Sequence, residues 1–188
     1  DYNFYRREQW SAGYELTHRF SSALQFTQNL RWSDYSEYQQ VIYGAGLAAD
    51  NRTVLRFNFP YSEDSQQFAI DSRFDAKVAT GALEHRMLAG LDYRNYRNQA
   101  AFAFAGATSI DLFNPVYGQP IAIPALSPSI DQEPRQMGVY GQDELKLGGW
   151  RLTLSAREDW LRTRSGSTTI LSDNAFTYRV GLNYGVDA

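Results

Sequence analysis

Few side chains in this sequence could carry out catalysis or hold a metal ion. Its 188 residues include two histidines, His18 and His85, and no cysteine. The histidines are far apart in the chain and make a poor pair of metal ligands, and a thiolate site is impossible. Glu158 and Asp159 are neighbours in a segment with strand-like alternation, so they point to opposite faces and cannot form an acid–base pair. No catalytic triad or cysteine–histidine arrangement is present, and we expect neither an enzyme nor a resident cofactor.

Aromatic residues are the more prominent group. Thirteen tyrosines and eleven phenylalanines contribute to an aromatic content of 15%, and tyrosine and tryptophan favour boundaries between water and apolar surroundings. The formal net charge is −3, which gives no basic footprint for binding nucleic acid. No run approaches the roughly 18 apolar residues of a transmembrane helix. A helical membrane protein is therefore excluded, whereas a membrane β-barrel is not, because its alternating strands average out in hydropathy.

The elements that position these residues are strands, because apolar and polar residues alternate with a period of two. In the segment RLTLSAREDW (151–160), Leu152, Leu154 and Ala156 fall on one face, while Arg151 and Arg157 fall on the other. The same pattern recurs along the chain and predicts seven strands. They span residues 9–20, 23–33, 68–78, 82–97, 136–147, 150–162 and 176–186.

The connections between the predicted strands alternate in length. Very short turns alternate with longer segments near 34–65, 98–135 and 163–175, the first of which contains Pro60, a residue expected to end any local strand. Short turns at one end and long loops at the other are typical of an up-and-down outer-membrane barrel, whose apolar face meets lipid and whose polar face meets the lumen. We therefore predict an all-β fold of antiparallel strands. Bacterial barrels have even numbers of strands, so seven strands indicate a fragment.

Four segments resemble, in order and spacing, the TonB-dependent ferric-siderophore receptors, most closely the ferrichrome-type hydroxamate branch. They are LQFTQNLRWSDYSEYQQVIYGAG, DSRFDAKVATGALEHRMLAGLDYRNYR, LFNPVYGQP and RQMGVYGQDELKLGGWRLTLSAREDW. The resemblance covers nearly the whole chain and implies a segment, residues 1–188, of a 22-stranded barrel in the bacterial outer membrane. The N-terminal plug of the family is absent from these residues.

The resemblance also implies the partners of the complete receptor. It would bind a ferric siderophore outside the cell and import it with energy delivered by the TonB complex through the plug, and its outer face would contact membrane lipid. The iron arrives already chelated, so the protein needs no metal ligands of its own.

The resemblance places ligand contacts on aromatic residues of the external loops. Tyr43 in VIYGAG matches an aromatic used for binding, Phe104 in AFAFAG falls on or next to a second, and Tyr117 in FNPVYG is a third candidate. Aromatic side chains suit this task because they give rigid apolar area with a polar tip at low entropic cost. Ala45 stands where the branch has a further loop aromatic, which leaves the identity of the siderophore open.

Two other interpretations fit parts of the pattern. A segment of another outer-membrane barrel, such as a porin, would also need charges on the inner face, but not long loops rich in aromatic residues. A soluble β-sandwich that acts as a binding module would also alternate, but its strands would be about half as long. Such a module should also interrupt the apolar row of residues 176–184 with charge, and this row is uninterrupted.

Overall fold

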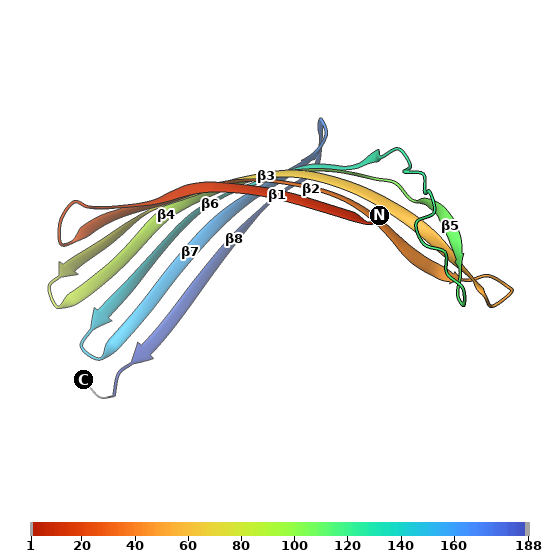
Figure 1. The fold of residues 1–188 in the computed structure, drawn as a ribbon. Coiled ribbons are helices and arrows are strands. Elements are labelled where there is room, and N and C mark those ends of the chain that lie inside the picture. Colours follow the sequence, from red (N-terminus) through yellow and green to blue (C-terminus); the bar gives the residue numbers. More distant parts are fainter. Residues whose placement is uncertain (1, 187–188) are drawn as a thin grey trace. The chain divides into compact units, whose positions relative to one another are not determined.

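The computed structural model describes residues 2–186, and their fold is all-β (Figure 1). Within this range no helix is long and apolar enough to cross a membrane. Seven strands pair in the order β1-β2-β3-β4-β6-β7-β8, and the short strand β5 pairs with β3. The strands are β1 (Phe4–Arg19), β2 (Leu24–Leu47), β3 (Thr53–Thr80), β4 (Leu83–Phe102), β5 (Ala105–Asp111), β6 (Ser127–Leu147), β7 (Trp150–Ser165) and β8 (Thr168–Tyr184).

The chain divides into two compact units that share the long strands. The first unit contains residues up to 10, 34–66 and 97–132, and includes β5 and the irregular segment 112–126. The second contains residues 11–33, 67–96 and those from 133 onward, and includes β7 and β8. Each unit is described separately below.

The structure corrects the predicted boundaries of the loops. β2 continues to Leu47 and β3 begins at Thr53, so only residues 48–52 connect them where a loop near 34–65 was predicted. Likewise β4 and β6 extend into 98–135, and the predicted loop at 163–175 reduces to the turn between β7 and β8. These extensions carry polar or aromatic side chains on both faces. The apolar alternation that marks a strand is therefore lost, although backbone pairing continues.

Pro60 lies inside β3 and does not end it, contrary to the prediction. The N–H and C=O groups of a strand residue point to the same neighbouring strand, and proline lacks the N–H. The Pro60 carbonyl accepts a hydrogen bond from Ala103 N at 3.1 Å. Ala103 lies between the end of β4 and the start of β5, whose pairing with β3 reaches Asn58↔Ala105. The N–H group that Pro60 lacks is therefore missing at the point where the strand paired with β3 changes from β4 to β5.

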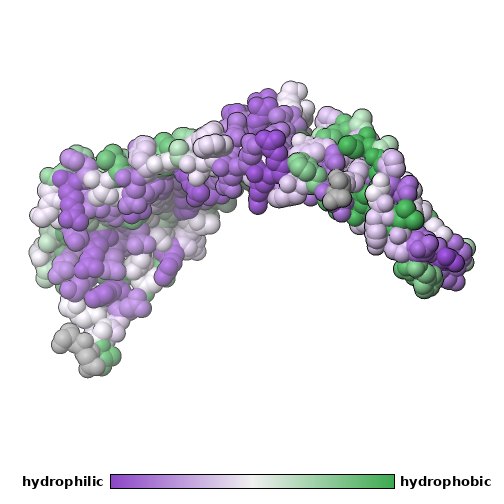
Figure 2. Space-filling model, viewed as in Figure 1, coloured by the Kyte–Doolittle hydropathy of each residue, from purple (hydrophilic) through white to green (hydrophobic). Residues whose placement is uncertain are grey.

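In the second unit, the register of β7 with β8 assigns residues to the two faces of the sheet. Directly paired residues of antiparallel strands share a face. One face is apolar and carries Leu152↔Leu182, Leu154↔Val180 and Ala156↔Tyr178. The other face is polar and carries Thr153↔Gly181, Ser155↔Arg179 and Arg157↔Thr177. This confirms the prediction of one apolar and one charged face, and Figure 2 shows hydrophilic side chains (purple) predominating on the side of β6 and β7 in view.

Aromatic residues border the apolar face of the second unit. Trp150 and Tyr184, next to a turn, have ring centroids 4.7 Å apart, and Trp160 occupies the same face ten residues along β7. At about 3.3 Å per residue and a tilt near 40°, this spacing corresponds to a band roughly 25 Å tall. The apolar bands of outer-membrane barrels have this height and are flanked by similar aromatic girdles.

A network of charged and polar side chains crosses the polar face of the second unit. Arg157 lies at its centre, with Nη1 donating to Asp92 on β4 at 2.6 Å and Nε donating to Asp159 at 2.7 Å. Tyr140 on β6 donates to Asp71 on β3 at 2.5 Å, and the Arg157 guanidinium lies 5.5 Å from the centre of its ring. These contacts link four strands through ionised partners, which form the stronger class of hydrogen bonds.

Two glycines leave the space that this network occupies. A Cβ atom at Gly90 would lie 2.6 Å from the Tyr140 hydroxyl oxygen and 2.8 Å from the carbonyl oxygen of Ser72. A Cβ atom at Gly138 would collide with the guanidinium of Arg157. Glycine at these two positions therefore lets large polar side chains lie flat across neighbouring strands.

We predict that Gly90→Ala destabilises the full-length protein by about 1–3 kcal/mol, because the methyl group overpacks a site bounded by a backbone carbonyl. Gly181→Ala is the matched control, since the nearest atom there is Thr153 Cβ at 4.0 Å. Urea unfolding in detergent, followed by tryptophan fluorescence, measures both changes. Equal midpoints for the two variants would show that Tyr140 moves aside at no cost.

Candidate functional site

Six aromatic side chains of the first unit form a continuous aromatic cluster. The ring centroids of Tyr43 and Phe104 are 6.0 Å apart, and those of Phe57 and Phe104 are 4.6 Å apart. Phe59 extends the cluster, with centroid distances of 5.6 Å to Phe102 and 6.1 Å to Tyr61. The aromatic cluster therefore comprises Tyr43, Phe57, Phe59, Tyr61, Phe102 and Phe104.

Strand alternation brings these rings to one face. Phe57, Phe59 and Tyr61 are two residues apart on β3 and point to the same side. The pairing of β3 with β5, with Phe57 opposite Gly106, places Phe104 next to the β3 aromatics. Tilted arrangements at these distances contribute about 0.5–1.5 kcal/mol per pair beyond the area they bury.

The aromatic cluster remains open to a ligand. Tyr43 is 41% exposed and Phe104 is 54% exposed, whereas Phe57 and Phe59 are half-buried beneath them. Contiguous exposed aromatic area in a folded protein commonly marks a binding site. The cluster thus offers a firm apolar floor, and its tyrosines supply hydroxyl groups that can donate or accept hydrogen bonds.

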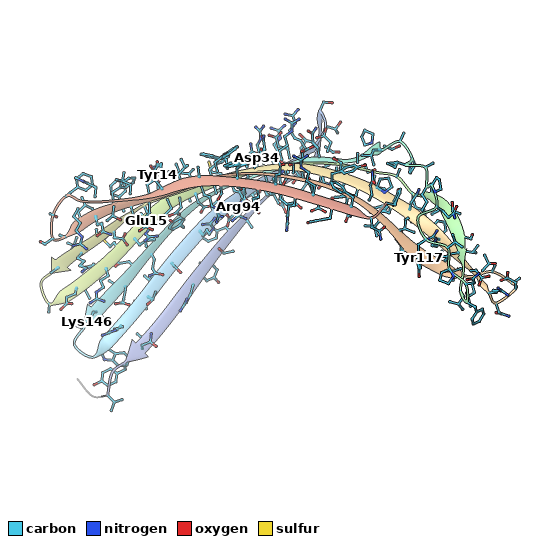
Figure 3. All side chains as sticks on the ribbon, in the orientation of Figure 1. Tyr14, Glu15, Asp34, Arg94, Tyr117 and Lys146 are labelled. Atoms are coloured by element: carbon cyan, nitrogen blue, oxygen red, sulfur yellow. The ribbon has the colours of Figure 1, made fainter. Side chains whose placement is uncertain are left out.

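The irregular segment 112–126 lies over the opposite face of β3. Asn58, which points away from Phe57 and Phe59, is 1% exposed, and its Nδ2 donates to the carbonyl oxygen of Ala122 at 2.7 Å. Tyr117 belongs to this segment and is 77% exposed (Figure 3). The structure therefore brings Tyr43 and Phe104 together and leaves Tyr117 outside the aromatic cluster. A ligand contact by any of the three stays a prediction.

Sequence analysis missed Phe57, Phe59, Tyr61 and Phe102. The signal was present in FNFPY (57–61), where aromatics recur at every second position. The expectation that Pro60 ends the strand hides this signal, because it removes residues 57–61 from the predicted strands.

Hydrogen-bonded pairs of tyrosine and glutamate lie next to the aromatic cluster in the first unit. The Tyr61 hydroxyl donates to Glu63 at 2.6 Å, and Tyr35 and Tyr5 both donate to Glu37. Burial, followed by the neighbouring Glu63 carboxylate, raises the pKa of Tyr61, so it remains protonated and acts as a donor. These pairs give the aromatic cluster a neighbouring row of fixed hydrogen-bonding groups.

The turn between β2 and β3 is held by Asp50. Its Oδ1 accepts hydrogen bonds from Arg52 N and Thr53 N at 3.0 and 2.8 Å, and its Oδ2 accepts one from the Thr53 hydroxyl at 2.6 Å. Asn51 has a φ of 53°, a left-handed conformation that asparagine tolerates. Arg52 Nε in turn donates to Asp111 at the end of β5 at 2.6 Å, so the turn and β5 are fixed together.

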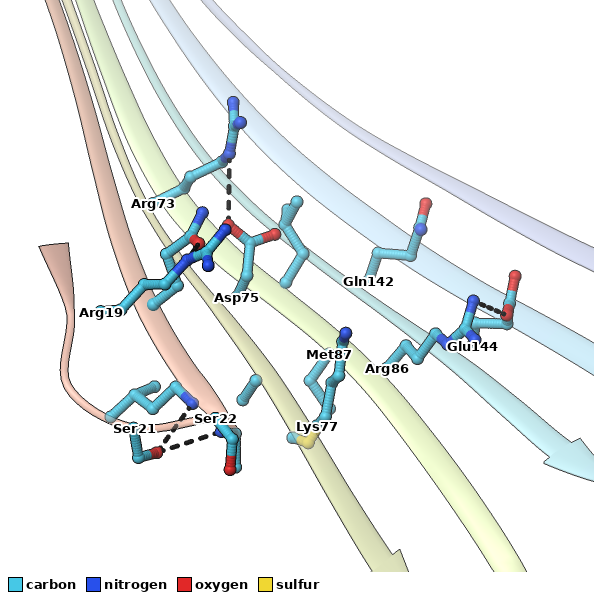
Figure 4. A pocket seen from close by; sticks show the side chains of 15 residues that line it. Arg19, Ser21, Ser22, Arg73, Asp75, Lys77, Arg86, Met87, Gln142 and Glu144 are labelled. Carbon is cyan, nitrogen blue, oxygen red and sulfur yellow. Dashed lines mark hydrogen bonds and ion pairs between the residues drawn. The ribbon is translucent and has the colours of Figure 1, made fainter. Parts of the chain in front are cut away.

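The second unit has a charged hollow on its polar face, next to the short turns (Figure 4). Its volume is about 680 Å³, and it contains four basic side chains and two acidic ones. Arg73 Nε lies 3.5 Å from Asp75, and Arg86 Nη1 lies 3.7 Å from Glu144. No group of three or more residues in the described part of the chain could hold a metal ion. The basic members are Arg19, Arg73, Lys77 and Arg86.

The sequence is similar to known receptors along its full length. A family model described as TonB dependent receptor-like, beta-barrel, matches residues 1–187. The ferrioxamine B receptor of Salmonella typhimurium LT2 is 35% identical over 194 residues, which cover 100% of this chain and 27% of that protein. The ferrichrome outer membrane transporter/phage receptor of Escherichia coli K12 is 29% identical over 216 residues, which cover 98% and 29%. The chain thus spans between a quarter and a third of these curated relatives.

Solved structures share the fold at lower identity. The ferric-catecholate import receptor Fiu of Escherichia coli K12 has a TM-score of 0.75 at 14% identity, over 100% of this chain and 32% of that one. The ferric preacinetobactin receptor of Acinetobacter baumannii has a TM-score of 0.73 at 16% identity, over 95% and 28%.

We predict that Asp50 stabilises the β2–β3 turn against local opening down to unusually low pH. The hydrogen bonds from Thr53 and Arg52 lower the pKa of Asp50 to about 2. A lowered pKa in the folded state stabilises the turn above the ordinary pKa near 4, and this contribution is lost as the pH falls towards 2. Hydrogen exchange of a peptide spanning residues 48–55 in the full-length receptor should be several-fold faster in Asp50→Ala than in wild type at pH 7 and pH 3. Asp64→Ala, an exposed control, should exchange like wild type, and an Asp50→Ala rate equal to wild type would contradict the prediction.

Proposed function

This chain belongs to the TonB-dependent receptor-like β-barrel family, and on that basis we propose that the complete protein is a receptor that imports ferric siderophores, with a hydroxamate as the ligand class. The chain is part of an outer-membrane barrel, whose apolar band faces lipid. Hydroxamate siderophores are the ligands named for its relatives, the ferrioxamine B and ferrichrome receptors. Iron is cargo here and is already chelated, so the binding surface must recognise the outside of an organic complex.

The contact between Tyr43 and Phe104 carries this proposal. Their rings are 6.0 Å apart and both are about half exposed, so they can present apolar area without rearrangement. A ferric hydroxamate complex exposes methylene chains and carbonyl oxygens, which match an aromatic floor bordered by tyrosine hydroxyls. A nonspecific porin needs charges on its inner face but has no use for such a floor.

The complete receptor would depend on partners beyond this chain. Import against a gradient needs energy, which we propose is delivered by the TonB complex through a plug region. The charged hollow of the second unit lies on the polar face, where it would be accessible to such a region. Catalysis forms no part of this proposal, because the ligand passes through without a change in covalent bonding.

We predict that Tyr43→Ala and Phe104→Ala each weaken binding of ferric ferrioxamine B or ferrichrome to the full-length receptor by roughly 10–100-fold, the range for a central aromatic anchor. Loss of either ring removes part of the apolar floor that excludes water from the bound complex. Quenching of intrinsic fluorescence on titration with each siderophore measures the change.

Two further variants make this test specific. Phe113→Ala is the matched control, because Phe113 is 74% exposed and lies in the segment outside the aromatic cluster. Tyr117→Ala tests the third predicted contact and, from its position, should change affinity less than Tyr43→Ala. Wild-type affinity in both cluster variants would overturn the assignment of the site, and failure of every hydroxamate to bind the wild-type receptor would overturn the ligand class.

A further inference from the structure

Two glutamates, Glu37 on β2 and Glu63 on β3, face each other beside the aromatic cluster. Three contacts between these strands follow a single register: Lys77 N with the Ala23 carbonyl at 2.8 Å, Gln28 with Ser72 at 2.8 Å, and Gln66 with Asp34 at 2.9 Å. Three residues further towards the turn, the same register places Glu37 directly opposite Glu63. Directly opposed side chains share a face, with their Cβ atoms about 5 Å apart. One small cation can therefore contact both carboxylates of this glutamate pair.

A tyrosine links the glutamate pair to the aromatic cluster. The ring of Tyr61 lies 6.1 Å from that of Phe59, and its hydroxyl donates to Glu63 at 2.6 Å. Burial, then Glu63 and then Glu37 raise the pKa of Tyr61, so both carboxylates lie near its hydroxyl. Phe59, Tyr61 and Glu63 occupy every second position of β3, and about 13 Å of strand separates the first from the last. A ligand on the aromatic cluster can thus extend an arm along β3 to the glutamate pair.

Each glutamate keeps one oxygen available. Tyr5 and Tyr35 both donate to Oε2 of Glu37, and Tyr61 donates to Oε2 of Glu63. Among residues 2–186, neither Oε1 atom has a hydrogen-bond partner, and neither is one of the buried unpaired atoms. The two Oε1 atoms are therefore accessible acceptors on half-buried side chains.

The glutamate pair lacks a cationic partner. In the described part of the chain, neither carboxylate forms an ion pair. Arg7 lies near Glu37, but its guanidinium is placed over the ring of Tyr35, 4.7 Å from the centre. One arginine beside two glutamates leaves a net negative charge, and like charges directly opposite each other destabilise a sheet. A cationic ligand would relieve this repulsion.

We propose that the glutamate pair binds the protonated amine of a linear ferric hydroxamate whose body lies on the aromatic cluster. This inference rests on the proposed function and names a narrower ligand class, a cationic ferric hydroxamate. An alkylammonium has three N–H donors and no acceptor, so it can donate to both Oε1 atoms and to one tyrosine oxygen. It stays protonated at neutral pH, as lysine side chains do. A neutral cyclic complex such as ferric ferrichrome has no group that replaces it.

Two ligands that differ by one charge test this site. Ferric ferrioxamine B carries a terminal ammonium, and acetylation of that amine removes the charge without altering the groups that hold the iron. Each complex is titrated into the full-length receptor in detergent, and quenching of intrinsic fluorescence measures its affinity. Wild type should bind the free amine at least roughly tenfold more tightly than the acetylated form, the lower end of the range for a hydrogen bond to a charged group.

Glutamine variants assign this preference to the glutamate pair. Glu37→Gln and Glu63→Gln keep the size of each side chain and should each reduce the preference, and the double variant should abolish it. Affinity for the acetylated complex should stay at the wild-type value in all three variants, which also reports that the receptor is folded. Glu15→Gln, at an exposed glutamate of the second unit, is the matched control and should keep the full preference.

The outcomes separate this inference from the proposed function. Equal affinity of wild type for the two complexes, or an undiminished preference in the double variant, would overturn the inference and leave the proposed function standing. An equal loss of affinity for both complexes in every glutamine variant would also overturn it, because the glutamate pair would then not discriminate by charge. Failure of both complexes to bind wild type would overturn the inference together with the proposed function.

Discussion

The alternation of side chains along a single sheet is the constraint on which this structure depends. Successive residues of a strand point to opposite faces of the sheet. In each strand here, one set of alternate residues must therefore suit the apolar side, and the other set must suit the polar side. Among residues 2–186, only five residues are buried: Thr27, Asn58, Pro60, Ala100 and Gly138. Stability therefore comes from the backbone ladder and from contacts across each face, since no apolar core is formed within the sheet.

The two faces of the second unit meet this constraint in different ways. On the polar face, charged groups neutralise one another both across strands, as Arg157 on β7 does with Asp92 on β4, and along one strand, as Arg157 does with Asp159. Because these side chains are long and lie flat, their neighbours must be small, which explains Gly90 and Gly138. The apolar face needs no such partners. His85 on β4 and Asp143 on β6, which alternation places on that face, pair with each other.

Alternation also decides how much could be predicted from sequence. Where one face is apolar, as in residues 151–160, the sequence predicts the strand and both of its faces correctly. Where polar and aromatic residues predominate on both faces, as in residues 34–47, hydropathy loses its period and the strand is mistaken for a loop. The proximity of Tyr43 and Phe104 could be anticipated only through family resemblance, because it depends on the long-range pairing of β3. The positions of Phe57 and Phe59 beside these two rings could not be predicted without the register of β3 with β5, which the sequence alone does not reveal.

The change of partner along β3 has a consequence for how such receptors diversify. The strand that pairs with β3 changes from β4 to β5 at Pro60 and Ala103. The segment that follows β5 packs on the face of β3 that carries Asn58. Residues can be inserted into or deleted from this segment without shifting the register of β4 against β6. The length of this peripheral segment can thus vary while the pairing of the long strands stays unchanged.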